Sequence, residues 1–236
     1  MKKFWLIPIA SLLSSPFFAQ HVTYLGIEIG AANDRFEYFD EGDQLVTTPL
    51  ANIRWGIIAG HTFNNSLSIE AGVIRKNYKE GFGFNFNSFE SSHTSTSIRT
   101  WQFPLRLKPK LRLFSDDVFF RPAVGFNYCI NRDNAFHSGG GGSVGTVEEA
   151  VTYHYDVDYG LTRSFMLVET SLGIEVELFE RAAISFSASY FTGFKPVIDL
   201  DLTYQINDGP DTIVKAHSKG EYVSFYIGMS YPLNFR

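Results

Sequence analysis

Two segments of the sequence carry residue types that could do catalysis or bind a ligand. His93-Thr94-Ser95 places an imidazole two positions from a hydroxyl, and a histidine can serve as the base that activates a serine nucleophile. The segment 138–143, Ser-Gly-Gly-Gly-Gly-Ser, has the glycine content of a phosphate-binding loop. It lacks the Gly-Lys-Ser/Thr ending that such loops use. We therefore predict a flexible extracellular linker at 138–143 and no nucleotide site.

The sequence predicts no metal or cofactor site. Its single cysteine, Cys129, excludes an intramolecular disulfide and a multi-cysteine zinc site. Three histidines, His137, His154 and His217, have no metal-ligand spacing. Carboxylates are calcium ligands, but those in the long links do not follow the spacing of an EF-hand, and we expect them to be solvated; they are Asp156, Asp158, Asp199, Asp201, Asp208 and Asp211.

Composition narrows the fold class. The 236 residues are 44% hydrophobic and 16% aromatic, and 19% are charged, against about 25% charged in typical soluble domains. The formal net charge is -5, so no basic excess indicates nucleic acid. After the N-terminal region no apolar run is long enough for a membrane-spanning helix. An all-β chain remains.

The first residues have the features of a secretory signal peptide. Lys2 and Lys3 give a positive start, and the apolar stretch 4–13 is too short to span a bilayer. Ala19 offers a small residue before a cleavage point. We predict a signal peptide at 1–19 and one domain at 20–236.

Eight later segments alternate large apolar residues with small or polar ones, which is the period of a β-strand. They start near Leu25, Ile53, Leu67, Trp101, Phe120, Val168, Ile184 and Val223. The links between them are alternately short, at 64–66, 114–117 and 179–181, and long, near 39–50, 79–97, 131–163 and 195–219. This order predicts consecutive antiparallel pairing.

The composition of the two faces favours a membrane over water. The polar face is rich in Gly and Ser, which suit the crowded interior of a narrow barrel, and the large apolar face suits lipid. We predict an all-β, eight-stranded antiparallel up-and-down transmembrane β-barrel, with a soluble β-barrel as the alternative. Short turns and both termini are then periplasmic. Aromatic girdles are expected at Phe36, Tyr38, Tyr78, Trp101, Phe165, Tyr190 and Phe194 on the outer side, and at Phe63, Phe114, Phe179 and Phe235 on the periplasmic side.

The inward face carries charges of both signs. Buried charges are tolerated when paired, so we expect a network that fills the lumen and leaves no continuous channel. Counting from the short turns predicts that Glu70 and Lys110 lie at one depth and interact. The set is Glu28, Glu70, Glu169, Glu175, Glu177, Arg54, Arg106, Lys108, Lys110, Arg112 and Arg121.

Two strands carry a recognisable motif. Residues 101–108 read Trp-Gln-Phe-Pro-Leu-Arg-Leu-Lys, and residues 120–126 read Phe-Arg-Pro-Ala-Val-Gly-Phe. The pair resembles the outer-membrane β-barrel family common in Bacteroidetes, labelled porin family or PorT-like, with OmpX-like eight-stranded barrels. The resemblance implies a monomer in the cell outer membrane. Its implied partners are outer-membrane lipids, lipopolysaccharide and, during insertion, the barrel-assembly machinery.

The function expected is non-enzymatic: a structural, adhesion, surface-interaction or secretion-associated role, with a possible protein partner at the long loops. Segments 151–159 and 197–206 alternate, so strands could extend beyond the membrane as hairpins. The alternative is a lipid A-modifying hydrolase using His93 and Ser95. Such enzymes hold the pair on a lipid-facing strand, whereas we expect this pair in a polar loop. No catalytic, cofactor or metal residue is predicted.

Overall fold

The computed structural model describes residues 21–40, 42, 45–47, 50–86, 89–144, 150–178 and 182–233, with only the backbone at 85–86 and 89–93. The predicted signal peptide lies outside the described residues. Among those described, no helix is long and apolar enough to span a membrane. The secondary structure of this part of the chain consists of strands and turns.

Eight strands close into a ring. Each pairs antiparallel with its neighbours, and β16 pairs with β1 to complete the ring, for example at Ile27↔Met229. Thr23 lies opposite Leu233, so both ends of the described chain lie at the end of the ring with the short turns. The predicted fold class is therefore confirmed; the ring strands are β1 (Val22–Asp34), β4 (Ala51–Phe63), β5 (Leu67–Phe86), β6 (Phe89–Pro109), β9 (Ala123–Asn131), β12 (Ser164–Glu177), β13 (Ala183–Gly193) and β16 (Tyr222–Leu233).

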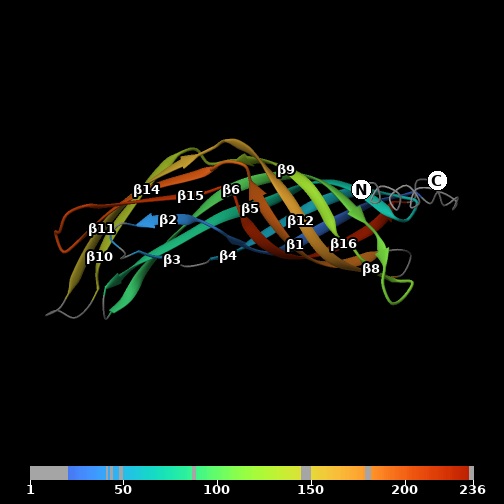
Figure 1. Ribbon diagram of the computed structural model, residues 1–236, viewed down its shortest axis with the longest axis horizontal. Helices are drawn as coiled ribbons and strands as arrows, with labels where there is room; N and C mark the ends of the chain where they lie inside the picture. Colours follow the sequence, from blue (N-terminus) through green and yellow to red (C-terminus); the bar gives the residue numbers. More distant parts are fainter. Residues whose placement is uncertain are drawn as a thin grey trace, which may run out of the picture.

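The opposite end carries a second sheet, in the order β10-β11-β14-β15-β2. It extends from the ring together with β3 and the outer half of the β5–β6 hairpin (Figure 1). We call this region, residues 78–98 with the five-stranded sheet and β3, the cap. β7 and β8 form a small hairpin at the short-turn end. The additional strands are β2 (Glu37–Asp40), β3 (Leu45–Thr47), β7 (Leu111–Arg112), β8 (Val118–Phe120), β10 (Phe136–Val144), β11 (Val151–Leu161), β14 (Ile198–Ile206) and β15 (Thr212–Ser218).

The predicted long links are largely strands. The predicted hairpin segments 151–159 and 197–206 are confirmed, since they lie in β11 and β14. The prediction of a flexible linker at 138–143 is wrong, because these residues form β10 and pair with β11. Glycine is needed at position 141 for close approach, because a Cβ there would lie 2.6 Å from the backbone carbonyl oxygen of Tyr153.

The two halves of the molecule have opposite surfaces. In the ring, outward side chains are apolar and exposed, such as Ile27 at 59%, whereas inward ones such as Arg54 are polar and buried at 1%. In the cap, inward Phe82 and Ile98 are apolar and each 1% exposed. In a soluble barrel the apolar face of the strands would point inward, away from water, whereas in this ring it points outward. We call this face, up to the cross-strand row of Arg75, the apolar band; it is the surface of a membrane-spanning barrel.

A charge on the apolar band should destabilise the barrel, whereas the same charge on the cap should not. Leu105 and Ser97 are both outward-facing residues of β6, one in the band and one beyond it. We expect Leu105→Arg to lower the unfolding free energy by about 2–4 kcal/mol, and Ser97→Arg to change it by less than about 0.5 kcal/mol. Urea unfolding in lipid vesicles, followed by heat-modifiability on gels, measures both. Equal effects would show that the band does not end near Arg75.

Candidate functional site

The centre of the lumen is one guanidinium among three carboxylates. Arg106 Nη1 lies 2.7 Å from Glu28 Oε1 and 3.6 Å from Glu70 Oε2, and Arg106 Nε lies 2.8 Å from Glu169 Oε2. These groups come from β6, β1, β5 and β12, so they span the interior. Arg106 is 1% exposed. The predicted charge network is confirmed, and it blocks the middle of the barrel.

The pairing predicted for Glu70 and Lys110 is wrong. Glu70 lies opposite Arg106 and pairs with Lys108, Nζ to Oε1 at 2.9 Å. Lys110 pairs instead with Glu177 at the mouth, where its backbone N–H donates to Ser66 O at 2.6 Å. The reason is that the chain continues through β7 and a turn after leaving the barrel, so counting back from Phe114 gave the wrong depth.

Other predicted lumen charges divide between the interior and the turn. Arg54 Nη2 lies 3.3 Å from Glu28 Oε2, and Arg121 Nε lies 3.3 Å from Glu175 Oε2. Arg112 is not in the lumen, because its side chain is 63% exposed and pairs with Asp116 in the turn. A polar cavity of about 220 Å³ at the short-turn end is lined by both charged pairs of the mouth: Lys110, Glu177, Arg121 and Glu175.

Aromatic rings close the lumen on the cap side. Lys76 pairs with Asp34, and its Nζ lies 3.5 Å from the ring centroid of Tyr78 and 4.4 Å from that of Tyr222. Phe191 stacks on Tyr222 with centroids 4.1 Å apart. The side chains of Lys76 and Asp34 are both 0% exposed, and the three aromatic residues are each at most 1% exposed. The lumen is therefore sealed at the level where the cap begins.

The predicted girdle is partly wrong. Tyr78 and Phe165 face inward and are buried at 0% and 5% exposed, because the prediction used their position at strand ends and ignored the face they lie on. Tyr38 also points inward, to Glu80. Outward exposure is confirmed for Trp101, Tyr190 and Phe194 on the cap side and for Phe63 and Phe114 on the other side. Phe179 and Phe235 lie outside the described residues.

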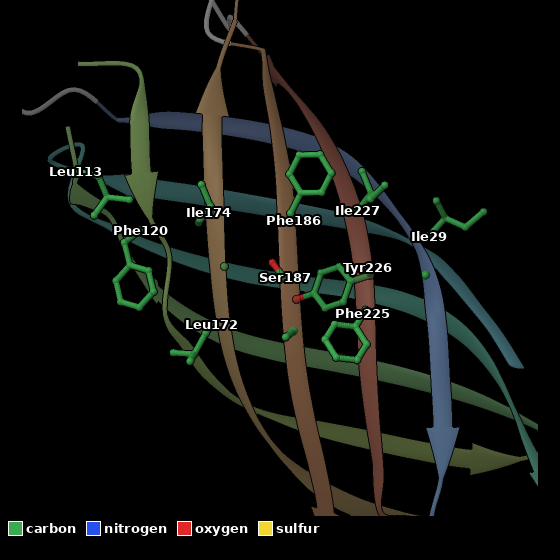
Figure 2. A pocket seen from close by; sticks show the side chains of 13 residues that line it. Ile29, Leu113, Phe120, Leu172, Ile174, Phe186, Ser187, Phe225, Tyr226 and Ile227 are labelled. Carbon is green, nitrogen blue, oxygen red and sulfur yellow. The ribbon is translucent and has the colours of Figure 1, made fainter. Parts of the chain in front are cut away.

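An apolar groove crosses the outward face of β12, β13 and β16. Its volume is about 680 Å³, and Figure 2 shows Phe186 and Phe225 beside it, with Leu113 and Phe120 on the far side. The groove arises because the small Ala188 lies in a cross-strand row between Leu172 and Phe225. Its position in the apolar band fits a lipid acyl chain.

The cap core contains a buried carboxyl group that joins three strands. Glu80 of β5 is 2% exposed. It accepts hydrogen bonds from Tyr38 Oη of β2 at 2.9 Å and Tyr159 Oη of β11 at 2.8 Å. Burial raises the pKa of Glu80, and the two hydrogen bonds partly offset this rise. Around it the packing is aromatic: the ring centroids of Phe84 and Tyr204 are 5.0 Å apart.

The outer face of the five-stranded sheet is acidic. Asp158 lies directly opposite Asp201, a like-charge pair that costs stability. His137 Nδ1 lies 3.0 Å from Asp158 Oδ1, and this hydrogen bond raises the pKa of His137. His217 Nε2 lies 3.2 Å from a carboxylate oxygen of Glu37. We call the set the acidic face: Glu37, Asp156, Asp158, Asp199 and Asp201.

Three histidines of the long links lie on strands: His137 on β10, His154 on β11 and His217 on β15. Sequence alternation did not place His137, because glycine-rich β10 gives no apolar signal. Asp208 and Asp211 lie in the link between β14 and β15. Within the described part of the chain, no group of three His, Cys, Asp or Glu side chains could hold a metal ion.

The residues of the hydrolase alternative lie on the cap. Ser95 is exposed on β6 opposite Gly81, and His93 lies opposite Gly83, with its side chain outside the described part. The expected loop is in fact the outer part of the β5–β6 hairpin. Ser95 lies beyond Arg99 and thus outside the apolar band. His61 of β4 is at the short-turn end, where its Nδ1 lies 2.9 Å from Thr23 Oγ1.

The backbone is similar to solved outer-membrane proteins at low identity. It matches the outer membrane protein OprG from Pseudomonas aeruginosa with a TM-score of 0.49 and 12% identity, over 89% of this chain and 96% of that one. For the outer membrane protease OmpT from Escherichia coli the values are 0.42, 12%, 90% and 97%. For Ail, the attachment invasion locus protein of Yersinia pestis, they are 0.31, 14%, 88% and 98%.

No family model matches the chain. No curated protein matches it. The likeness in shape assigns neither a family nor a role, since one fold carries unrelated functions.

The lumen pairs should stabilise the barrel only as sets. Removing one partner of a buried ion pair costs roughly 3–5 kcal/mol, because the other charge is left unpaired. We expect Glu70→Gln and Lys108→Gln to be strongly non-additive, with the double variant less destabilised than the sum. The matched cycle of Glu70→Gln with Lys110→Gln should be additive within about 0.5 kcal/mol. Urea unfolding in lipid measures both cycles, and additivity in the first would contradict the geometry described here.

The stability of the cap should depend on pH through Glu80. Its raised pKa means that the native cap holds a proton more tightly than the unfolded chain does. The cap should therefore be most stable at low pH and weaken as pH rises from the ordinary glutamate range of about 4.3 through the native pKa. Hydrogen exchange of β2 and β11 between pH 5 and 9 measures this opening. Glu80→Gln should flatten the dependence, and an unchanged slope would exclude Glu80 as its source.

Proposed function

We propose that this chain is an outer-membrane β-barrel protein that anchors a folded cap at the cell surface, where the cap contacts a protein partner. The observation that carries the proposal is the division of the molecule into a sealed ring and a cap with its own core. The Arg106 network and the Tyr78–Tyr222 layer leave the ring without a path for solutes. The surface available for recognition is therefore the cap.

The orientation proposed is cap outward, with both chain ends in the periplasm. Short turns and the strand ends at Thr23 and Leu233 share one end of the ring, as in bacterial outer-membrane barrels. The ring is closed, so no strand edge in the apolar band is left for a second copy. This supports a monomer. Membership of the Bacteroidetes porin or PorT-like family stays a prediction carried by the strand motifs at 101–108 and 120–126.

The contact surface proposed is the outer edge of β10. In the described sheet β10 pairs with β11 only, so its other edge has backbone groups available for an added strand. Gly139, Gly140 and Gly141 carry no side chains that could shield the backbone of β10. An extended segment of a partner protein could extend the sheet, which fits adhesion, surface assembly or secretion alike.

A photo-crosslinking residue at Ser143, an exposed residue of β10, tests this surface in intact cells. The matched control places the same residue at Thr203, on β14 in the interior of the same sheet. We expect one defined adduct from position 143 and none from 203, because β10 has an unpaired edge whereas β14 is paired on both sides. Adducts of equal yield from both positions, or from neither, would contradict recognition at β10.

The protein is proposed to be non-enzymatic, and the hydrolase alternative has a direct test. Mass spectrometry of lipid A should show no acyl-chain difference between wild-type cells, deletion cells and cells with Ser95→Ala. The physical reason is that Ser95 lies on the cap beyond the apolar band, away from lipid acyl esters. An acyl-chain difference that depends on Ser95 would establish the hydrolase and overturn the proposal.

A further inference from the structure

Outward-facing cations gather at one edge of the apolar band. At the cap-side edge the exposed or half-buried basic residues are Arg35, Arg75, Lys79, Arg99, Arg132, Arg163, Lys195 and Lys219. At the short-turn edge of the described chain, Arg112 is the outward Lys or Arg, and it is paired with Asp116. The two edges of the band thus meet different surroundings, and the cap-side edge fits an anionic one.

The centre of this edge is an arginine between two tryptophans. Arg75 of β5 lies directly opposite Trp55 of β4 on one side and Trp101 of β6 on the other. The tryptophans are 45% and 36% exposed on the outward face. Indole rings favour the boundary between hydrocarbon and headgroups. Within the described residues no carboxylate pairs with Arg75, so its guanidinium is available to an external anion.

Three more cations lie on the same side as Arg75: Arg99 on the neighbouring strand β6, Lys79 on β5 itself and Arg132 just after β9. Arg99 lies opposite Asn77 and is therefore a diagonal neighbour of Arg75. Arg132 is the residue directly after β9, and its backbone N–H donates to Arg99 O at 2.9 Å. Lys79 lies opposite Ser97 of β6. We call Arg75, Lys79, Arg99 and Arg132 the cation cluster. One described carboxylate, that of Asp133, pairs with it, at 2.7 Å from Arg99 Nη2.

We propose that the cation cluster binds the phosphate groups of a lipid in the outer leaflet. Arginine matches phosphate oxygens with paired N–H donors. Directly below the cluster, Val73 and Leu105 are 42% and 57% exposed and offer an apolar surface to the acyl chains. Farther out, the acidic face repels soluble polyanions. A phosphorylated lipid therefore fits better than a soluble anion does. The inference rests on the proposed outer-membrane location, whose failure would appear separately, as absence from the outer-membrane fraction.

The two tryptophans give a direct reporter of binding. Trp5, Trp55 and Trp101 are the tryptophans of the chain, and Trp5 lies in the predicted signal peptide, so the protein purified as residues 20–236 carries only the two beside Arg75. We titrate this protein in detergent micelles with bis-phosphorylated lipid A, with the same lipid after phosphate removal, and with inorganic phosphate. We expect a saturable emission change with the first, at least tenfold weaker binding of the second, and none of the third at millimolar concentration. Raising the salt concentration should weaken the binding.

Variants separate this site from general charge. Arg75→Gln combined with Arg132→Gln should weaken lipid A binding at least tenfold. The control Lys215→Gln, on the outer face of the five-stranded sheet, should change it less than twofold. Heat-modifiability on gels confirms that each variant is folded. Equal affinity for the dephosphorylated lipid, or unchanged binding by the folded double variant, would overturn the site. Tight binding of inorganic phosphate would refute the lipid as its source.

Discussion

The structure depends on a constraint of size: the interior of an eight-stranded ring is just wide enough for side chains, so each charge placed there must be compensated by another. Arg106 meets this constraint with Glu28, Glu70 and Glu169, which come from three other strands. The same packing that stabilises the charges removes the channel. In this molecule the closed lumen and the stability of the ring are two results of one arrangement.

The cap extends the same strands into different surroundings. On β5 the same side faces inward from Glu70 to Phe82; the aromatic residues Tyr78 and Phe82 appear on it only in the cap, where Glu80 is the one inward charged residue of this range. The outward side changes in the reverse sense, from Val73 to Lys79. No turn or bulge is needed at the boundary. The change in side-chain type along the strand therefore marks the edge of the apolar band. The cation cluster lies at this edge.

Much of the fold was predictable because lipid-facing strands show a strong alternation. The eight ring strands and the two hairpin segments 151–159 and 197–206 follow from it. The cap sheet as a whole did not, because β10 is mostly glycine and has no apolar period. The lumen network was predictable as a set, but its pairs were not: the register that brings Glu70 to Lys108 is fixed by the β5–β6 hairpin, whose turn lies far from both residues. The site at Arg75 was not predictable from sequence, because it depends on the cross-strand neighbours Trp55 and Trp101, which the pairing register brings beside it.

The composition of the Arg106 network also bears on the order in which the barrel can assemble. Besides Glu70 of β5, its carboxylates come from β1, the first ring strand, and from β12, the sixth of the eight. A partly inserted sheet holding β5 and β6 without both of these strands would leave Arg106 and Lys108 to share the single carboxylate of Glu70, an excess of positive charge near hydrocarbon, where ions are poorly tolerated. Insertion of one strand at a time would therefore pass through intermediates of high free energy. Insertion and closure should proceed as one cooperative event, with the last seam, between β1 and β16, formed while the central charge is already neutralised.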